Sequence, residues 1–233
     1  LTLIQHHQNN MGAFGGPDII TDELQIAIDA GSTRSYPGSG TTWSDLSGNG
    51  NNGTLTNGPT FNANNGGSFV FDGVDDYVQG GVPVQNTSAA TIEVWYKTSA
   101  DEAFPGENRL LFIGNGFTEG LSLRLRDDRA AFFVRKADNS GYWDIFSGDT
   151  VIDGQWKHLV GTFDTTSIKR YENGTLTQQT STGQQYKAAT NGWSVGGPSY
   201  LFDGNIAIAR FYNKTLTAAE VTQNYNAQKN RFI

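Results

Sequence analysis

Residues Ser68–Val78, which read SFVFDGVDDYV, decide how this chain folds. Phe69 and Phe71 alternate with smaller or polar residues. Because successive side chains of a strand point to opposite faces, both rings fall on one face of a sheet, which must then be covered. Gly73 permits a backbone reversal, and Tyr77-Val78 forms a second extended segment that can run back beside the first.

A turn-rich segment just upstream, Trp43–Leu55 (WSDLSGNGNNGTL), is dense in side-chain oxygens. Within it, Asp45, Ser47 and Asn49 reproduce the spacing of the first half of a helix-flanked calcium loop. The twelfth position of that register is Thr56 rather than Glu, and neither flank has a helical pattern. The sequence therefore excludes an EF-hand.

A calcium site of another kind stays open, in which loop oxygens combine with the carboxylates that follow Phe71. The candidate metal ligands are Asp45, Ser47, Asn49, Asp72, Asp75 and Asp76. The alternative is that Asp45 and Asn49 form Asx turns and that the glycines supply the positive φ angles of the loop. Calcium is the one cofactor that these residues suggest.

Composition points to one all-β domain. The chain has 233 residues, of which 29 are glycine and 17% are charged; globular proteins usually have roughly 25% charged residues. The net charge of −7 provides no field that would attract nucleic acid. The chain has no cysteine and no apolar run near the ~20 residues that span a bilayer. We expect a soluble protein without nucleic-acid partners or membrane insertion.

Short alternating segments predict about a dozen strands, of the length usual in sandwiches. Asn173-Gly174 predicts a tight hairpin, because both residues tolerate the positive φ angles of a type I′ turn. The expected strands are Leu24–Asp29, Thr60-Phe61, Ser68–Asp72, Asp76–Gln79, Thr91–Thr98, Arg109–Ile113, Leu121–Leu125, Ala130–Arg135, Tyr142–Phe146, His158–Phe163, Ile168–Tyr171, Thr175–Gln179 and Asn205–Tyr212. In Leu121–Leu125 the leucines alternate with Ser122 and Arg124, which is typical of a sheet with one buried and one solvated face.

One helix closes the chain. Thr217 can act as its N-cap with Glu220 at N3, which makes a capping box, and Leu216 can pack on Val221 as a hydrophobic staple. We expect this helix to end near Lys229. Two antiparallel sheets packed face to face, with this one short helix, are the economical arrangement.

Residues 1–22 show no sustained alternation and contain several glycines and a proline. We expect an extended N-terminal arm over residues 1–22 that packs on a neighbouring chain, and a single domain over residues 23–233. His6 and His7 lie in this arm, where a zinc site would need two more ligands. His158 falls in an alternating segment, which favours a structural role.

Four ordered segments resemble the laminin G-like branch of the concanavalin A-like lectin/glucanase jelly rolls. The pattern W-x-D-x-S-G-N-G-N-x-G is followed by S-x-x-F-D-G-x-D-D-Y-V, then by a W-x-H-V hairpin and a closing strand and helix. These patterns occupy Trp43–Gly53, Ser68–Val78, Gln155–Phe163 with Tyr171–Gly174, and Leu201–Tyr225. The resemblance covers residues 24–233 and implies an antiparallel two-sheet jelly roll.

The opening GGPDIITDELQIAIDAG, with SYPGSGTTWSDLSGNG after it, is similar to a lead-in of structural proteins of tailed bacteriophages. This similarity implies a virion surface, where the arm would contact other virion proteins or identical subunits. One position departs from the jelly-roll family. Related modules carry an acidic pair after the glycine-led G-x-I of the closing strand, where this chain has Ala207-Ile208. Any ligand role of that pair cannot be carried over, so a metal site here would have fewer ligands.

The sequence contains no recognisable catalytic motif. Glucanases of this fold carry a strand motif E-x-D-x-E that sets two carboxylates on one face, and this chain lacks it. It also lacks a G-x-S-x-G elbow and a phosphate loop. The acidic pairs Asp75-Asp76, Asp101-Glu102 and Asp127-Asp128 lie in apparent turns, where solvation explains them. We therefore expect no enzymatic activity.

Aromatic residues are the remaining candidates for binding. Tyr142, Trp143, Trp193 and Tyr200 adjoin glycine and serine in expected loops, where exposed rings could stack on sugars; the other interpretation is that they fill the core. The first hypothesis is a non-enzymatic structural protein of a phage virion surface, such as a capsid decoration or a fibre-like module. The alternative is a carbohydrate-binding lectin module for a cell-surface glycan, on a virion or in a secreted, extracellular bacterial protein.

Overall fold

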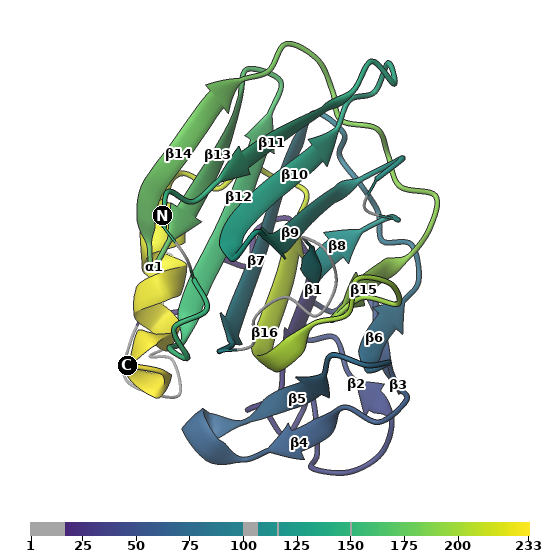
Figure 1. The fold of residues 1–233 in the computed structure, drawn as a ribbon, viewed down its shortest axis with the longest axis vertical. Helices are drawn as coiled ribbons and strands as arrows, with labels where there is room; N and C mark the ends of the chain where they lie inside the picture. The colour runs from purple at the N-terminus through teal and green to yellow at the C-terminus, as the bar shows by residue number, and fades with distance from the viewer. Residues whose placement is uncertain (1–16, 100–106, 116, 150) are drawn as a thin grey trace, which may run out of the picture.

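Two antiparallel sheets pack face to face in the computed structural model, which describes residues 17–99, 107–115, 117–149 and 151–233 (Figure 1). Sheet A has the order β14-β13-β12-β7-β16-β5-β4, and β1 also pairs with β16. Sheet B has the order β11-β10-β9-β8-β15-β6-β3-β2. The predicted all-β jelly-roll sandwich with one short C-terminal helix is confirmed.

The strands mostly coincide with the predicted segments. Sheet A contains β1 (Leu24–Asp29), β4 (Thr60–Asn62), β5 (Ser68–Asp72), β7 (Ala89–Lys97), β12 (Lys157–Asp164), β13 (Ser167–Glu172), β14 (Thr175–Ser181) and β16 (Asp203–Tyr212). Sheet B contains β2 (Thr42–Trp43), β3 (Gly53–Thr56), β6 (Tyr77–Gly80), β8 (Asn108–Ile113), β9 (Leu121–Arg126), β10 (Arg129–Arg135), β11 (Tyr142–Phe146) and β15 (Trp193–Val195). The helices of the described residues are α1 (Ala218–Gln228) and two single 3-10 turns, η1 (Asn64–Gly66) and η2 (Lys229–Arg231).

The core lies between the sheets. Phe69 and Phe71 from sheet A are fully buried in it, as predicted, and Phe132 from sheet B belongs to the same hydrophobic cluster. Gly161 on β12 is required for the close approach of the sheets, because a Cβ atom there would overlap the ring of Phe132. The inner faces of the two sheets are therefore filled by the core, and a binding site on the sheets can form only from side chains on their outer faces.

The segment Ser68–Val78 corrects one expectation. Its two halves do not form a hairpin: β5 pairs with β16 and β4 in sheet A, whereas β6 pairs with β15 and β3 in sheet B. The turn at Gly73 (φ 71°) instead carries the chain from one sheet to the other. Val78 faces the core from its own sheet, just as Phe71 does, so the alternation alone could not distinguish a hairpin from this crossover.

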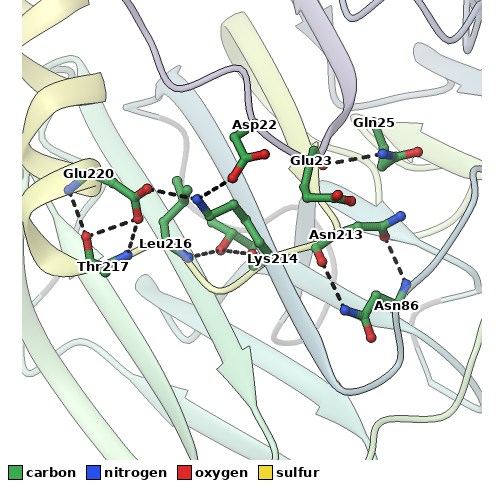
Figure 2. Close-up of polar contacts among 10 residues, drawn as sticks. Asp22, Glu23, Gln25, Asn86, Asn213, Lys214, Leu216, Thr217 and Glu220 are labelled. Atoms are coloured by element: carbon green, nitrogen blue, oxygen red, sulfur yellow. Dashed lines mark hydrogen bonds and ion pairs between the residues drawn. The ribbon is translucent and has the colours of Figure 1, made fainter. Parts of the chain in front are cut away.

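Two local predictions are confirmed. Asn173 and Gly174 have φ angles of 49° and 77° and join β13 to β14. Thr217 caps α1: its backbone N–H donates to Glu220 Oε2 (2.8 Å), and its Oγ1 accepts from the Glu220 N–H (3.3 Å) (Figure 2). Among the described residues, no helix combines the length and the apolar character that crossing a membrane requires.

The last residues of the predicted arm lie on the domain itself. The Ile20 N–H donates to Asn224 Oδ1 and Gln223 Nε2 donates to the Asp18 carbonyl, both at 2.8 Å, and both partners belong to α1. Lys214 bridges Asp22 and Glu220 at 2.9 Å from each (Figure 2). Residues 1–16, with His6 and His7, lie outside the described residues, so the arm and the domain boundary stay predictions.

Candidate functional site

The predicted calcium loop is a hydrogen-bonded turn. Asp45 Oδ1 accepts from the backbone N–H groups of Ala27 (2.8 Å) and Ser47 (2.9 Å), and Oδ2 accepts from Ser47 Oγ (2.6 Å). Asn49 Nδ2 donates to the Leu24 carbonyl at 2.9 Å. The polar groups of Asp45, Ser47 and Asn49 thus fasten the loop to β1, which is the Asx-turn chemistry considered from the sequence.

The other three candidate ligands form a separate acidic group. Carboxylate oxygens of Asp72, Asp75 and Asp76 lie within 4.8 Å of one another; in the described part of the chain, Asp45 is not in this group. A hydrogen bond from the Val74 N–H lowers the pKa of Asp72. Burial, and then the negative charge of Asp72, raises the pKa of Asp76. This crowding favours a bound cation, so calcium at the Asp72–Asp76 turn stays a prediction.

The four predicted aromatic residues divide into two pairs. Trp193 is 1% exposed and belongs to the core, and Trp143 packs on the core with its ring centroid 5.9 Å from that of Phe163. Tyr142, in contrast, is 51% exposed at the start of β11, and Tyr200 is half-buried with a φ of 61°. Of the four, Tyr142 and Tyr200 are the two that do not belong to the core or pack on it.

These two tyrosines meet on the outer face of sheet B, where they line a cavity of about 570 Å³. Strands β9, β10 and β11 supply its floor, because their outward positions carry Arg124, Phe133 and Tyr142 while Leu123 and Leu125 point inward. The full lining is Glu107, Phe117, Arg124, Arg126, Asp127, Phe133, Tyr142 and Tyr200. We call this cavity the ring pocket.

Charges at the floor of the ring pocket are paired. Arg124, whose side chain is 2% exposed, forms ion pairs with Glu107 (2.9 Å) and with Asp144, and its guanidinium lies 4.7 Å from the centre of the Phe133 ring. Burial raises the pKa of Asp144, although the charge of Arg124 opposes that rise. Both carboxylates therefore share one guanidinium, which fixes its position under the rings.

The sequence did not point to Glu107, Phe117, Arg124 or Phe133 as site residues. Its one signal was the alternation of Ser122, Arg124 and Arg126 with leucines, which we interpreted as a solvated face. Instead, Ser122 and Arg124 are 1% and 2% exposed, because the surrounding segments cover this face in part.

A second buried charge group lies on the outer face of sheet A and is closed to solvent. Glu93 pairs there with Arg210, and His158 Nε2 lies 3.1 Å from Glu93 Oε1. Asn224 of α1 covers the group and donates to Glu93 Oε2 at 2.7 Å. His158 is fully buried beside the rings of Trp95 and Tyr225, in keeping with a structural histidine.

Comparisons with known proteins support the resemblance found in the sequence. The model of the concanavalin A-like lectin/glucanases superfamily matches residues 72–222. A search of curated proteins found no match.

Solved structures share the fold at low identity. The binding domain of botulinum neurotoxin serotype D is 15% identical with a TM-score of 0.71, over 90% of this chain and 53% of that one. The serotype D ligand binding domain in complex with N-acetylneuraminic acid is 15% identical with a TM-score of 0.70, over 90% of this chain and 52% of that one. The binding domain of Paraclostridial Mosquitocidal Protein 1 is 14% identical with a TM-score of 0.68, over 89% of this chain and 52% of that one. The chain thus spans about half the length of these structures.

Proposed function

The chain belongs to the concanavalin A-like lectin/glucanases superfamily, and on this basis we propose that it is a non-enzymatic carbohydrate-binding module. The observation that carries the proposal is the ring pocket. There, the rings of Phe117, Tyr142 and Tyr200 surround a floor that holds the Glu107–Arg124 ion pair.

Sugar chemistry matches this combination of groups. A pyranose has an apolar C–H face, which packs on aromatic rings, and a rim of hydroxyl groups, which need donors and acceptors. The Glu107 carboxylate can accept from hydroxyls. Arg124 Nε is buried without a hydrogen-bond partner in the described part of the chain, so one polar group of the floor is left unsatisfied.

The pairing of the carboxylates supports binding rather than hydrolysis. A glycosidase needs one carboxyl group that delivers a proton and a second that acts as nucleophile or base. Glu107 and Asp144 both contact the Arg124 guanidinium. Either one would have to leave its ion pair before it could transfer a proton.

Structural neighbours agree with this proposal at the level of the fold. They are binding domains, and one of them was solved with N-acetylneuraminic acid. Their sequences are too distant to identify a ligand for this chain.

A glycan array with the wild-type protein and Tyr142→Ala tests the proposal. Tyr142 is half-exposed, so its truncation should leave the fold intact while it removes one wall of the ring pocket. We expect the wild type to bind defined glycans and Tyr142→Ala to bind them about tenfold or more weakly. Leu176→Ala is the matched control, because Leu176 is 42% exposed on β14 of the other sheet. Binding that is equal in all three proteins would contradict the proposal.

We also propose the setting that the lead-in sequence suggests, a phage virion surface, with a secreted bacterial protein as the alternative. The arm would then join the module to other virion proteins or to identical subunits. Mass spectrometry of purified particles tests this setting independently of glycan binding, and the absence of the chain from particles would favour the secreted form.

A further inference from the structure

A second, smaller cavity of about 270 Å³ lies beside the ring pocket on the outer face of sheet B. Strands β6, β8 and β15 line it together with the loops at residues 114–115 and 198–199. Among its described lining residues, Arg109 is the one charged side chain. We call it the arginine pocket.

Arg109 is a buried cation without a carboxylate. Arg109 is 3% exposed, and no carboxylate lies within ion-pair distance of its guanidinium in the described part of the chain. Among the described residues, the one hydrogen bond of its side chain is long, from Nη1 to Ser199 Oγ at 3.4 Å. Burial lowers the pKa of Arg109, although the negative charge of Glu107, which forms no ion pair with it, opposes that shift. A buried guanidinium without an ion pair is costly unless another group compensates its charge.

Three aromatic rings compensate part of that charge. The guanidinium carbon lies 4.7 Å from the centres of the Phe112 and Phe117 rings and 4.9 Å from that of Tyr200. These rings hold the guanidinium at the boundary between the two cavities, because Phe117 and Tyr200 also line the ring pocket. Ring faces attract a cation but accept no strong hydrogen bonds, so most of the N–H groups of Arg109 are available to a ligand.

A second buried polar group lines the same cavity. Ser194 is 3% exposed on β15, and its Oγ has no hydrogen-bond partner among the described residues. Its neighbours across the strands are Gln79 and Phe112, which also line the cavity. A hydroxyl donor and a guanidinium therefore converge on a space that contains no acidic side chain.

We propose that the arginine pocket binds an oxyanion, and that the ligand of this module is an acidic glycan whose carboxylate or sulfate group lies at Arg109 while its neighbouring sugar ring lies in the ring pocket. The glycan part of this inference rests on the proposed function; the anion part stands on the arginine pocket alone. The two cavities differ in the required way, because each arginine of the ring pocket has a carboxylate nearby: Arg124 pairs with Glu107, and Arg126 lies 3.8 Å from Asp144.

Calorimetric titration with three trisaccharides tests the proposal. The first is built from neutral galactose, the second from galacturonate and the third from sulfated galactose. We expect at least one acidic form to bind about tenfold or more tightly than the neutral form, which is the strength of one charge-assisted contact. The uronate and the sulfate ester distinguish the two sources of an oxyanion. Equal binding of all three would overturn the acidic-glycan inference and leave the carbohydrate-binding proposal intact.

Four variants locate the effect. Arg109→Gln removes the charge, and Ser199→Asp places a carboxylate on an exposed residue whose Oγ already lies 3.4 Å from Arg109. Both should lose the preference for acidic sugars. Ser199→Asn, the neutral counterpart at the same lining position, should lose less of it than Ser199→Asp. Arg129→Gln, which changes an arginine outside both cavities, should keep it. If Arg109→Gln fails to fold, the comparison of Ser199→Asp with Ser199→Asn tests the proposal instead. A preference for acidic over neutral sugars that persists in folded Ser199→Asp overturns the proposal.

Inorganic sulfate separates the anion subsite from the glycan. Because sulfate also stabilises proteins by exclusion from their surface, melting is compared among the variants and against chloride at equal ionic strength. An extra rise of the melting temperature in the wild type and Ser199→Asn, absent in Ser199→Asp, supports the subsite even if no sugar binds. Equal rises in all of them would overturn the subsite.

Discussion

The outer faces of sheets A and B both carry charged side chains that are more than nine-tenths buried, but a helix closes only the first. On sheet A, Glu93 and Arg210 pair beneath α1, and Asn224 of the helix completes the network. On sheet B, Arg109 and Arg124 line cavities that open to solvent. Buried charged residues are thus closed off from solvent on sheet A, where α1 covers them, and line open cavities on sheet B, where no helix of the described residues covers them.

This difference separates a structural network from a candidate binding surface. A closed ion pair contributes to the docking of the helix, and its removal leaves an uncompensated charge inside the protein. A charge at the floor of a cavity can be compensated by a ligand or by water. We therefore expect stability to depend mainly on the sheet A face and binding on the sheet B face.

The largest expected effect is that of Glu93→Gln. This change leaves Arg210 buried without its carboxylate and should lower the free energy of unfolding by about 3–5 kcal/mol, as measured by urea denaturation. Asp153→Asn is the control, because Asp153 is 46% exposed in its pair with Lys157, and it should change stability by less than about 1 kcal/mol.

The double variant Glu93→Gln with Arg210→Met sharpens this test. Removing both charges should recover much of the lost stability, because no charge is left unpaired. If the single and double variants lose the same amount, packing rather than charge explains the loss.

The pH dependence of stability should follow from Glu93. Burial opposes its ionisation, but Arg210 and His158 outweigh burial and hold the pKa of Glu93 at about 2, against an ordinary 4.5. A pKa that is lower in the folded state stabilises the protein above pH 4.5, and this contribution is lost as the pH falls towards 2. It should amount to about 3 kcal/mol. Urea denaturation of the wild type and Glu93→Gln across this range measures it.

Asp144 on the other face should behave in the opposite way. Because burial raises its pKa, the folded state takes up the proton more readily, and stability gained from this group rises as the pH falls. Asp144→Asn should remove that contribution. Identical pH profiles for the Glu93 and Asp144 variants would show that the two faces do not differ electrostatically.

Calcium should act on neither face but at the Asp72–Asp76 turn. If it binds there, millimolar calcium should stabilise the wild type by about 1–3 kcal/mol through mass action, as measured by thermal melting against a chelator. Asp45→Asn should keep this response, since the Asp45 carboxylate is occupied by hydrogen bonds of its own loop, whereas Asp72→Asn should lose it. Unchanged melting in the wild type would remove the calcium hypothesis.

The smallest expected effect on stability is that of Tyr142→Ala, in the ring pocket. Tyr142 is 51% exposed, so its truncation should cost less than about 1 kcal/mol in urea denaturation. Tyr212→Ala is the contrast beneath α1, where a fully buried ring should cost about 3–5 kcal/mol. Similar losses in the two variants would contradict the division between the faces.

The sequence predicted elements that depend on neighbouring residues. The hairpin at Asn173-Gly174 and the Thr217–Glu220 capping box each involve two to four consecutive residues, and both were found. Pairing between distant strands was not predictable in this way. Ser68–Val78 shows why: the alternation indicates which side chains are buried, but it does not indicate which sheet buries them.

The candidate site was predictable only in part, for the same reason. Tyr142 and Tyr200 were candidates and line the ring pocket, but Trp193 was an equal candidate and lies in the core, where Gly53 and Gly80 leave room for its ring. Arg109 gave no signal at all. Its environment comes from Phe117, in the loop after its own strand, and from Tyr200, which is distant in sequence and joins it only in the folded protein.

The position of β16 has a consequence for how this chain folds during synthesis. Residues 203–212 pair with β7 on one side and with β5 and β1 on the other, so Leu24 finds its partner only in Tyr212. At about 5–20 residues per second, a ribosome takes on the order of 10–40 s to advance from β1 to β16. Until then, β1, β5 and β7 have exposed edges and no central strand. Nascent chains should therefore need protection from aggregation until β16 is made, and the sheet should then close slowly, as is usual for folds with distant contacts.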